Sequence, residues 1–158
     1  MIAVNYLIDG HNLIPKIPGL SLSDLNDEEQ LNELLVSFSK NTRSKIEVYF
    51  DKASIGSDKK KVIGHVKVVY VSIGFRADDV IIKKLLGLKK EAKNWVVVTS
   101  DRQIISAASS VHAKVIRSED FSELLTSTKY NKNVDEKNDD ISQEEIDEWI
   151  QLFQNKLK

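Results

Sequence analysis

The feature that most constrains the fold is an alternation of short apolar runs with segments of helical periodicity. Five apolar runs have the length and residue types of buried β-strands, and they span residues 3–9, 45–51, 65–72, 95–101 and 113–118. Apolar residues recur at helical spacing between or after these runs, at residues 24–40, 77–92, 102–112 and 118–125. Strands that alternate with helices predict βαβ units, and therefore an α/β fold with helices on both faces of a mostly parallel sheet.

Two parts of the chain depart from this pattern. Residues 45–72 carry two strands with no helix between them, so we expect an irregular connection or a locally antiparallel pairing. Residues 127–140 are polar and unpatterned, which is typical of a linker, and residues 141–158 then form an amphipathic helix. The apolar stripe of that helix consists of Ile146, Trp149, Ile150 and Phe153. The sequence thus predicts an α/β domain at 1–126, a linker at 127–140 and a C-terminal helix at 141–158.

Composition excludes several classes of site. The sequence has no Cys, so a thiolate zinc site, a disulfide framework and a cysteine nucleophile are all ruled out. No apolar run approaches the ~20 residues that cross a bilayer, and the N-terminus lacks the basic region of a signal peptide, so we expect a cytoplasmic protein. The net charge is −1, from 23 basic and 24 acidic residues. The charge of the chain as a whole therefore does not indicate nucleic-acid binding.

Acidic side chains fall at the end of each predicted strand that has a clear terminus. Ligands of open α/β sheets bind beyond the carboxyl ends of the strands. The residues placed there are Asp9 and Asn12 after the first strand, Asp51 and Lys52 after the second, Arg76, Asp78 and Asp79 after the third, and Asp101 and Arg102 after the fourth. Because neighbouring strands lie ~4.8 Å apart, we expect these carboxylates to converge.

Converging carboxylates repel one another unless they are protonated or neutralised by a cation. Oxygen ligands in a chain without Cys and with little His favour Mg²⁺ or Mn²⁺. A site of this kind orients phosphate oxygens and activates water for in-line attack. The acidic edge therefore predicts a metal site that works on phosphate esters.

Each of these residues also has a purely structural interpretation. Asp9-Gly10 is a common turn signal, Asp78 and Asp79 suit the positive end of a helix dipole, Asp101 can cap a helix, Asp51-Lys52 can be a solvated turn, and His11 and the lysines at 59–61 can be loop residues. Four separate caps are a poor explanation for four acids at one edge of a sheet. The joint pattern therefore favours a functional acidic site.

Four motifs, in this order and spacing, resemble the NYN domain and, more narrowly, its bacterial YacP-like branch within the PIN-like nuclease superfamily. They read LIDGHNLI, VYFD, FRADDVIIKKL and VVVTSDRQI. The resemblance covers about residues 3–125 and extends weakly to the C-terminal helix. It implies a three-layer α/β/α PIN-like fold and a metal-dependent endoribonuclease activity.

The resemblance also implies roles for individual residues. Asp9, Asp78 and Asp101 match the catalytic acids that bind Mg²⁺ or Mn²⁺, and Asp79 matches a further acid of many members. Asn12 matches the Asn that follows the first acid. We expect Asn12, together with the flanking cations Lys52, Arg76 and Arg102, to contact the substrate.

The resulting hypothesis is hydrolysis of RNA phosphodiester bonds, in mRNA, rRNA or tRNA, to leave 5′-phosphate and 3′-hydroxyl ends. A substrate presented by the ribosome, as the resemblance suggests, would offset the near-neutral charge of the chain. Ile82 and Ile105 stand where many relatives carry further acids, which leaves a thinner acidic shell. The alternative is a non-catalytic RNA- or protein-binding module on a degenerate PIN-like scaffold. An aspartyl phosphatase with Asp9 as nucleophile is less well supported, because no second Asp follows two residues later.

Overall fold

The computed structural model describes residues 4–23, 26–53, 59–72, 74–134, 148, 150 and 151. Within these residues, six strands form one sheet in the order β3-β4-β2-β1-β5-β6. The strands are β1 Asn5–Asp9, β2 Lys45–Ala53, β3 Lys59–Ile63, β4 Val66–Ser72, β5 Trp95–Val98 and β6 Lys114–Ile116. Every pair is parallel except β3 with β4, which is antiparallel. The predicted α/β class with a mostly parallel sheet is confirmed.

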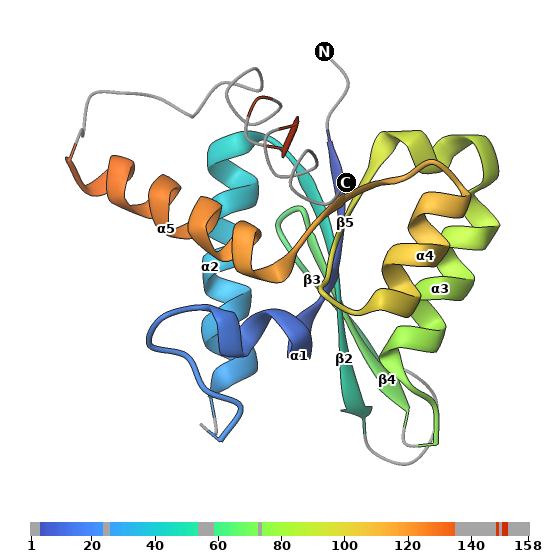
Figure 1. Ribbon diagram of the computed structural model, residues 1–158. Coiled ribbons are helices and arrows are strands. Elements are labelled where there is room, and N and C mark those ends of the chain that lie inside the picture. The colour runs from blue at the N-terminus through green and yellow to red at the C-terminus, as the bar shows by residue number, and fades with distance from the viewer. Residues whose placement is uncertain are drawn as a thin grey trace.

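Helices cover both faces of this sheet, as the predicted three-layer α/β/α architecture requires. They are α1 Gly10–Leu13, the 3₁₀ turn η1 Ile14–Lys16, α2 Asp27–Thr42, α3 Ala77–Leu88, the 3₁₀ turn η2 Lys89–Asn94, α4 Arg102–Ser110 and α5 Ser118–Val134. Figure 1 shows α1, α2 and α5 on one side of the sheet and α3 and α4 on the other. Within the described part of the chain, no helix is long and apolar enough to span a bilayer.

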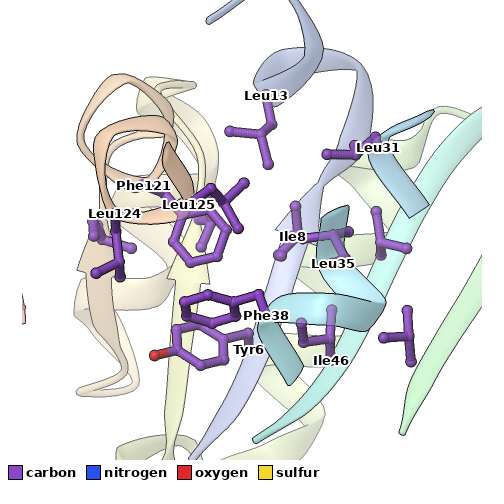
Figure 2. Packing of buried hydrophobic residues seen from close by; sticks show 14 of the residues in the cluster. Tyr6, Ile8, Leu13, Leu31, Leu35, Phe38, Ile46, Phe121, Leu124 and Leu125 are labelled. Carbon is purple, nitrogen blue, oxygen red and sulfur yellow. The ribbon is translucent and has the colours of Figure 1, made fainter. Parts of the chain in front are cut away.

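Each face of the sheet has its own apolar core, because successive residues of a strand point to opposite faces. Tyr6 and Ile8 of β1 belong to the core under α2 and α5, whereas Leu7 belongs to the core under α3 and α4. In the first core, the rings of Tyr6, Phe38 and Phe121 contact one another at centroid distances of 5.2–5.6 Å (Figure 2). Burial on both faces explains the uniformly apolar strand sequences.

The connection between β2 and β4 contains the strand β3, which the sequence analysis assigned to a loop. β2 and β4 are parallel, and β3 pairs antiparallel with the outer edge of β4. The side chains of Lys59, Lys60 and Lys61 are exposed, so the strand has no apolar face that could reveal it. The pairing of β3 with β4 depends on backbone hydrogen bonds and on the turn at Gly64, whose φ of 60° suits glycine.

The C-terminal part of the chain differs in one boundary from the sequence analysis. Helix α5 extends to Val134, so the first residues of the predicted linker at 127–140 are helical. Ile150, from the predicted apolar stripe, lies in a helical segment and is 2% exposed within the core under α2 and α5. The other stripe residues, Ile146, Trp149 and Phe153, lie outside the described residues. The C-terminal segment therefore packs on its own domain at Ile150, while the division into three segments stays a prediction.

Candidate active site at the carboxyl edge of the sheet

Asp9 is the last residue of β1, a strand in the interior of the sheet between β2 and β5. The Asp9-Gly10 pair is not a turn, because Gly10 is the first residue of helix α1. A Cβ atom at Gly10 would lie 2.2 Å from Cε1 of Phe50, a ring that is fully buried. Glycine is therefore required here for close packing rather than for an unusual φ, and the chain turns into a helix directly after the carboxylate.

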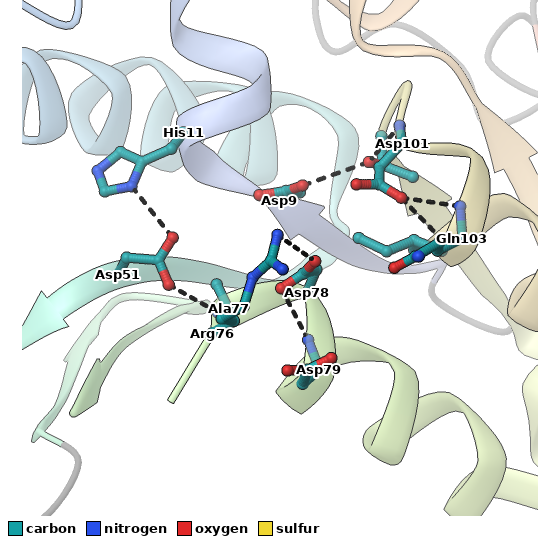
Figure 3. Close-up of polar contacts among 11 residues, drawn as sticks. Asp9, His11, Asp51, Arg76, Ala77, Asp78, Asp79, Asp101 and Gln103 are labelled. Carbon is teal, nitrogen blue, oxygen red and sulfur yellow. Dashed lines mark hydrogen bonds and ion pairs between the residues drawn. The ribbon is translucent and has the colours of Figure 1, made fainter. Parts of the chain in front are cut away.

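The carboxyl group of Asp9 has the most perturbed acidity of this edge. The pKa of Asp9 is raised from 3.8 to about 6, chiefly by burial. The hydrogen bond that the Thr99 hydroxyl donates, at 3.4 Å, opposes the rise, and the negative charges of Asp101, Asp51 and Asp78 contribute to it. Four carboxylates from separate elements therefore act on one another, as the sequence analysis expected (Figure 3).

Asp78 lies in the first turn of α3 and its side chain is only 11% exposed. Its Oδ1 atom accepts a hydrogen bond from the backbone N–H of Asp79 at 3.1 Å, and its Oδ2 atom lies 3.2 Å from Nη2 of Arg76. Asp79 itself is exposed, and Figure 3 shows it beyond Asp78, away from Asp9. The structure thus brings Asp78 to the site and leaves Asp79 at its margin.

Asp101 has the capping role that the sequence suggested for it, and it also lies at the acidic edge, where its functional role stays a prediction. It is the N-cap of α4, because its Oδ1 atom accepts hydrogen bonds from the backbone N–H groups of Gln103 and Ile104 at 2.8 and 3.3 Å. Its own backbone N–H donates to the Thr99 hydroxyl at 3.1 Å, and that hydroxyl donates to Asp9. Thr99 therefore connects the first and the last acid of the site.

Asp51 is not the solvated turn residue that the sequence analysis favoured. It lies within β2, at an irregularity in the pairing with β4, and its Oδ1 atom accepts a hydrogen bond from the backbone N–H of Ala77 at 2.7 Å. This bond attaches the start of α3, and hence Asp78, to the second strand. No sequence signal indicates it, because the two residues are 26 positions apart.

His11, which was expected to be a loop residue, lies in α1 between two carboxylates. Its Nε2 atom lies 2.8 Å from Oε2 of Glu28, and its Nδ1 atom lies 3.9 Å from Oδ2 of Asp51. The ring also contacts Phe50, with the centroids 5.3 Å apart. His11 thus connects the acidic edge to helix α2.

Asn12, in α1, holds together the two loops that follow β5 and β6. Its Oδ1 atom accepts hydrogen bonds from the backbone N–H of Ser100 at 2.8 Å and from the hydroxyl of Ser118 at 2.6 Å. The Ser100 hydroxyl in turn donates to Glu119 at 2.7 Å, and Lys16 lies 3.5 Å from the same carboxylate. The amide oxygen of Asn12 is therefore committed to the loops that follow β5 and β6, and its predicted contact with substrate stays a prediction.

The predicted phosphate-binding cations lie at different points around the acids. Arg76 is 76% exposed beside Asp78, and Arg102 is exposed at the first position of α4. The side chain of Lys52 lies outside the described part of the chain. Ile82 and Ile105, the two positions where the acidic shell is thinner, pack against the core under α3 and α4.

The carboxylates of this edge have the chemistry of ligands for a divalent cation, but they are not spaced as a complete set of ligands. Carboxylate oxygens are the preferred ligands of Mg²⁺ and Mn²⁺. The pKa of Asp9 is raised mainly by burial and in part by the charges of three nearby acids, and a cation would offset those charges. Among the described residues, however, no group of three or more His, Asp or Glu side chains is arranged closely enough to hold a metal ion. The residues present are thus suitable in kind, but they do not form a closed coordination shell.

Comparison with known proteins agrees with this fold. The chain resembles two crystal structures of Rae1 (YacP) from Bacillus subtilis. One has 23% identity and a TM-score of 0.67 over 84% of this chain and 78% of that chain. The other, a single-substitution mutant, has 22% identity and a TM-score of 0.63 over 78% and 76%. No curated protein matches.

A family model described as the YacP-like NYN domain matches residues 6–157. That range includes all of the acids described above and the C-terminal segment with Ile150. Because the match covers nearly the whole chain, the protein belongs to the family of YacP-like NYN domains, a PIN-like nuclease type of domain.

Proposed function

We propose that this protein is a metal-dependent endoribonuclease that hydrolyses RNA phosphodiester bonds at the carboxyl edge of its sheet. The observation that carries the proposal is the raised pKa of Asp9. Burial and the charges of Asp101, Asp51 and Asp78 raise this pKa to about 6. A structural cap or turn does not need three further acids around a buried carboxylate. A site that binds a cation does.

In this proposal Asp9, Asp78 and Asp101 hold Mg²⁺ or Mn²⁺, and Asp79 contributes from the margin. The chemistry that such a cation supplies when bound is electrostatic, because it polarises the phosphate oxygens and the attacking water. The hard oxygen donors of the three acids suit this role. Cleavage leaves a 5′-phosphate and a 3′-hydroxyl end.

The remaining residues position the acids and the substrate. Thr99 orients the carboxylate of Asp9, and Asp51 fixes the start of α3 so that Asp78 stays at the edge. Arg76 and Arg102 are exposed beside the acids, where their guanidinium groups can bind phosphates of the RNA backbone. The net charge of −1 provides little attraction for free RNA, so we propose that the cytoplasmic substrate is presented on a larger particle such as the ribosome.

The test is cleavage of a fluorescently labelled, unstructured RNA in Mn²⁺ by the parent protein and by Asp78→Asn. Removing this charge should lower the rate by about 100-fold or more, because the transition state loses electrostatic stabilisation. The matched control is Glu123→Gln, which removes an exposed acid from α5 and should leave the rate unchanged. Thermal melting establishes that each variant is folded. Full activity of Asp78→Asn would refute the assignment.

A second candidate function is a non-catalytic module that binds RNA or protein. Two observations favour it: among the described residues no metal-holding group is formed, and Arg76 already pairs with Asp78. This candidate predicts that the parent protein binds RNA in the presence or absence of Mn²⁺ and cleaves none. Cleavage that requires Mn²⁺ and Asp78 excludes it.

A further inference from the structure

The loop between β4 and α3 presents two large side chains to solvent next to the acidic edge. Phe75 is 69% exposed, and the adjacent Arg76 is 76% exposed. Phe75 directly precedes Arg76 and is two residues before Ala77 and Asp78 begin the next helix, so its exposed ring lies beside the acidic edge, where a bound ligand can reach it.

This loop is held in place at both of its ends. The backbone N–H of Phe75 donates to the carbonyl oxygen of Ser72 at 3.1 Å, and Gly74 has a φ of 100°, which suits glycine. On the other side, Ala77 is 2% exposed and its N–H is bound by Asp51. Phe75 and Arg76 therefore project from a fixed backbone, which lowers the entropic cost of binding.

The charges around Phe75 suit a polyanion. Arg76 has five N–H donors and uses the Nη2 atom toward Asp78, so most of its guanidinium faces solvent. Strand β3, which pairs with β4 just before the turn, carries the exposed lysines Lys59, Lys60 and Lys61. Lys59 lies opposite Tyr70, two residues before the turn begins at Ser72. The edge strand and the loop thus provide basic groups that lead toward the acids.

We propose that Phe75 and Arg76 form a binding site for one unpaired nucleotide of the substrate, next to the cleavage site. The base stacks on the ring of Phe75, and Arg76 binds the adjoining phosphate, which draws its guanidinium away from Asp78. The lysines of β3 contact the strand farther along. This inference rests on the proposed function, because it takes the acidic edge as the place where RNA is cleaved.

Stacking determines which form of RNA the site accepts. In single-stranded nucleic acids, bases stack on exposed aromatic side chains without regard to sequence. In a duplex, the faces of each base are already covered by its neighbours, and A-form helices are recognised through their shape and their 2′-hydroxyls. The site therefore selects unpaired RNA over paired RNA, with little preference among the four bases.

The test measures binding by fluorescence anisotropy in EDTA, so that it does not depend on cleavage. The probes are a short unstructured RNA and a duplex of the same length. Phe75→Ala should weaken binding of the unstructured RNA by roughly 5-fold or more, as base stacking on an aromatic ring predicts. Phe75→Trp should bind at least as tightly as the parent protein. Phe75→Leu should lose affinity like the Ala variant, because an aliphatic side chain offers no ring for stacking.

Leu86→Ala is the matched control, since Leu86 is an exposed apolar residue, at 53%, on the same helix as Asp78. It should bind both probes as the parent protein does. Arg76→Ala should reduce the slope of log affinity against log salt by about one, as the loss of one phosphate contact requires.

The inference is overturned if Phe75→Ala binds the unstructured RNA as tightly as Leu86→Ala does, or if Phe75→Leu binds it as tightly as the parent protein. It is likewise overturned if Phe75→Ala loses as much affinity for the duplex as for the unstructured RNA. It is also overturned if the parent protein binds neither probe. Each of these outcomes can occur while Asp78→Asn still abolishes cleavage, in which case the proposed function stands without this nucleotide site. Conversely, if Phe75→Ala loses affinity for the unstructured RNA but the parent protein cleaves no RNA, the result supports this nucleotide site together with the second candidate function, a non-catalytic module that binds RNA.

Discussion

Replacing Asp9 with Asn should stabilise the metal-free protein near neutral pH, although it removes a residue of the proposed active site. The reason is the pKa of Asp9, which burial and three neighbouring acids raise from 3.8 to about 6. An ionised Asp9 is therefore less favourable in the folded state than in the unfolded chain. Asn carries no charge, and its amide oxygen can still accept the hydrogen bond from Thr99.

The pH dependence follows from the direction of this shift. Well below pH 3.8, Asp9 is protonated in both states and contributes nothing to the difference. As the pH rises through the unfolded value of 3.8, only the unfolded chain ionises, and the folded state loses stability until the pH passes about 6. Each pKa unit is worth ~1.36 kcal/mol, so the full penalty above that pH is about 3 kcal/mol.

The assay is thermal or urea unfolding in EDTA across the range from about pH 3, about one unit below the unfolded pKa, to about pH 8. Near neutral pH, Asp9→Asn should melt about 6–12 °C above the parent protein, and the two should melt together at the acidic end. Glu123→Gln, an exposed acid on α5, is the control that should show no such pH-dependent gain. A gain of the same size at every pH, or a loss of stability near neutral pH, would refute the account of the acidic edge.

Three further substitutions test the packing and the polar contacts around the site. Gly10→Ala should cost about 1–3 kcal/mol in urea unfolding, because the new Cβ would lie 2.2 Å from the ring of Phe50; a stability equal to the parent protein would contradict this. Asn12→Ala should cost about 1–3 kcal/mol, since it leaves two donors without their acceptor, and hydrogen exchange should show looser loops after β5 and β6. Asp101→Asn should keep the cap of α4 whereas Asp101→Ala loses about 1 kcal/mol, and equal stabilities of the two variants would exclude the capping role.

The sheet could be predicted because its strands are buried on both faces. Residues 6–8 and 95–98 are apolar and lie in the middle of the sheet, so a short apolar run was a sufficient signal. Strand β3 could not be predicted in the same way, because its exposed lysines leave only backbone pairing with β4. The same holds for the last part of α5, whose residues beyond 125 carry no clear apolar stripe.

The acids of the site could be predicted because strand ends determine their position. Asp9 is the last residue of β1, Asp101 lies just beyond the end of β5, and Asp78 lies in the first turn of α3. The predicted ends of these elements therefore placed the three acids at one edge of the sheet. The hydrogen bonds that position these acids could not be predicted, because they join residues that are far apart in the chain. The N–H of Ala77 meets Asp51 across 26 positions.

The glycine after Asp9 illustrates the same limit. Asp9-Gly10 has the sequence of a turn, yet Gly10 is the first residue of a helix. The ring of Phe50, from another strand, occupies the space that a side chain at residue 10 would need, so glycine is required by a tertiary contact that the sequence does not reveal. The position of the carboxylate was correct, but the reason for the glycine was not.

Titration calorimetry of Mn²⁺ binding, on the parent protein and on Asp9→Asn near neutral pH, tests whether the acidic edge binds a metal ion. The parent protein should bind Mn²⁺, and Asp9→Asn, although folded and more stable, should not. Glu123→Gln should bind as the parent protein does. Equal binding by Asp9→Asn, or no binding by the parent protein, would contradict the claim that the acidic edge is a metal-dependent active site.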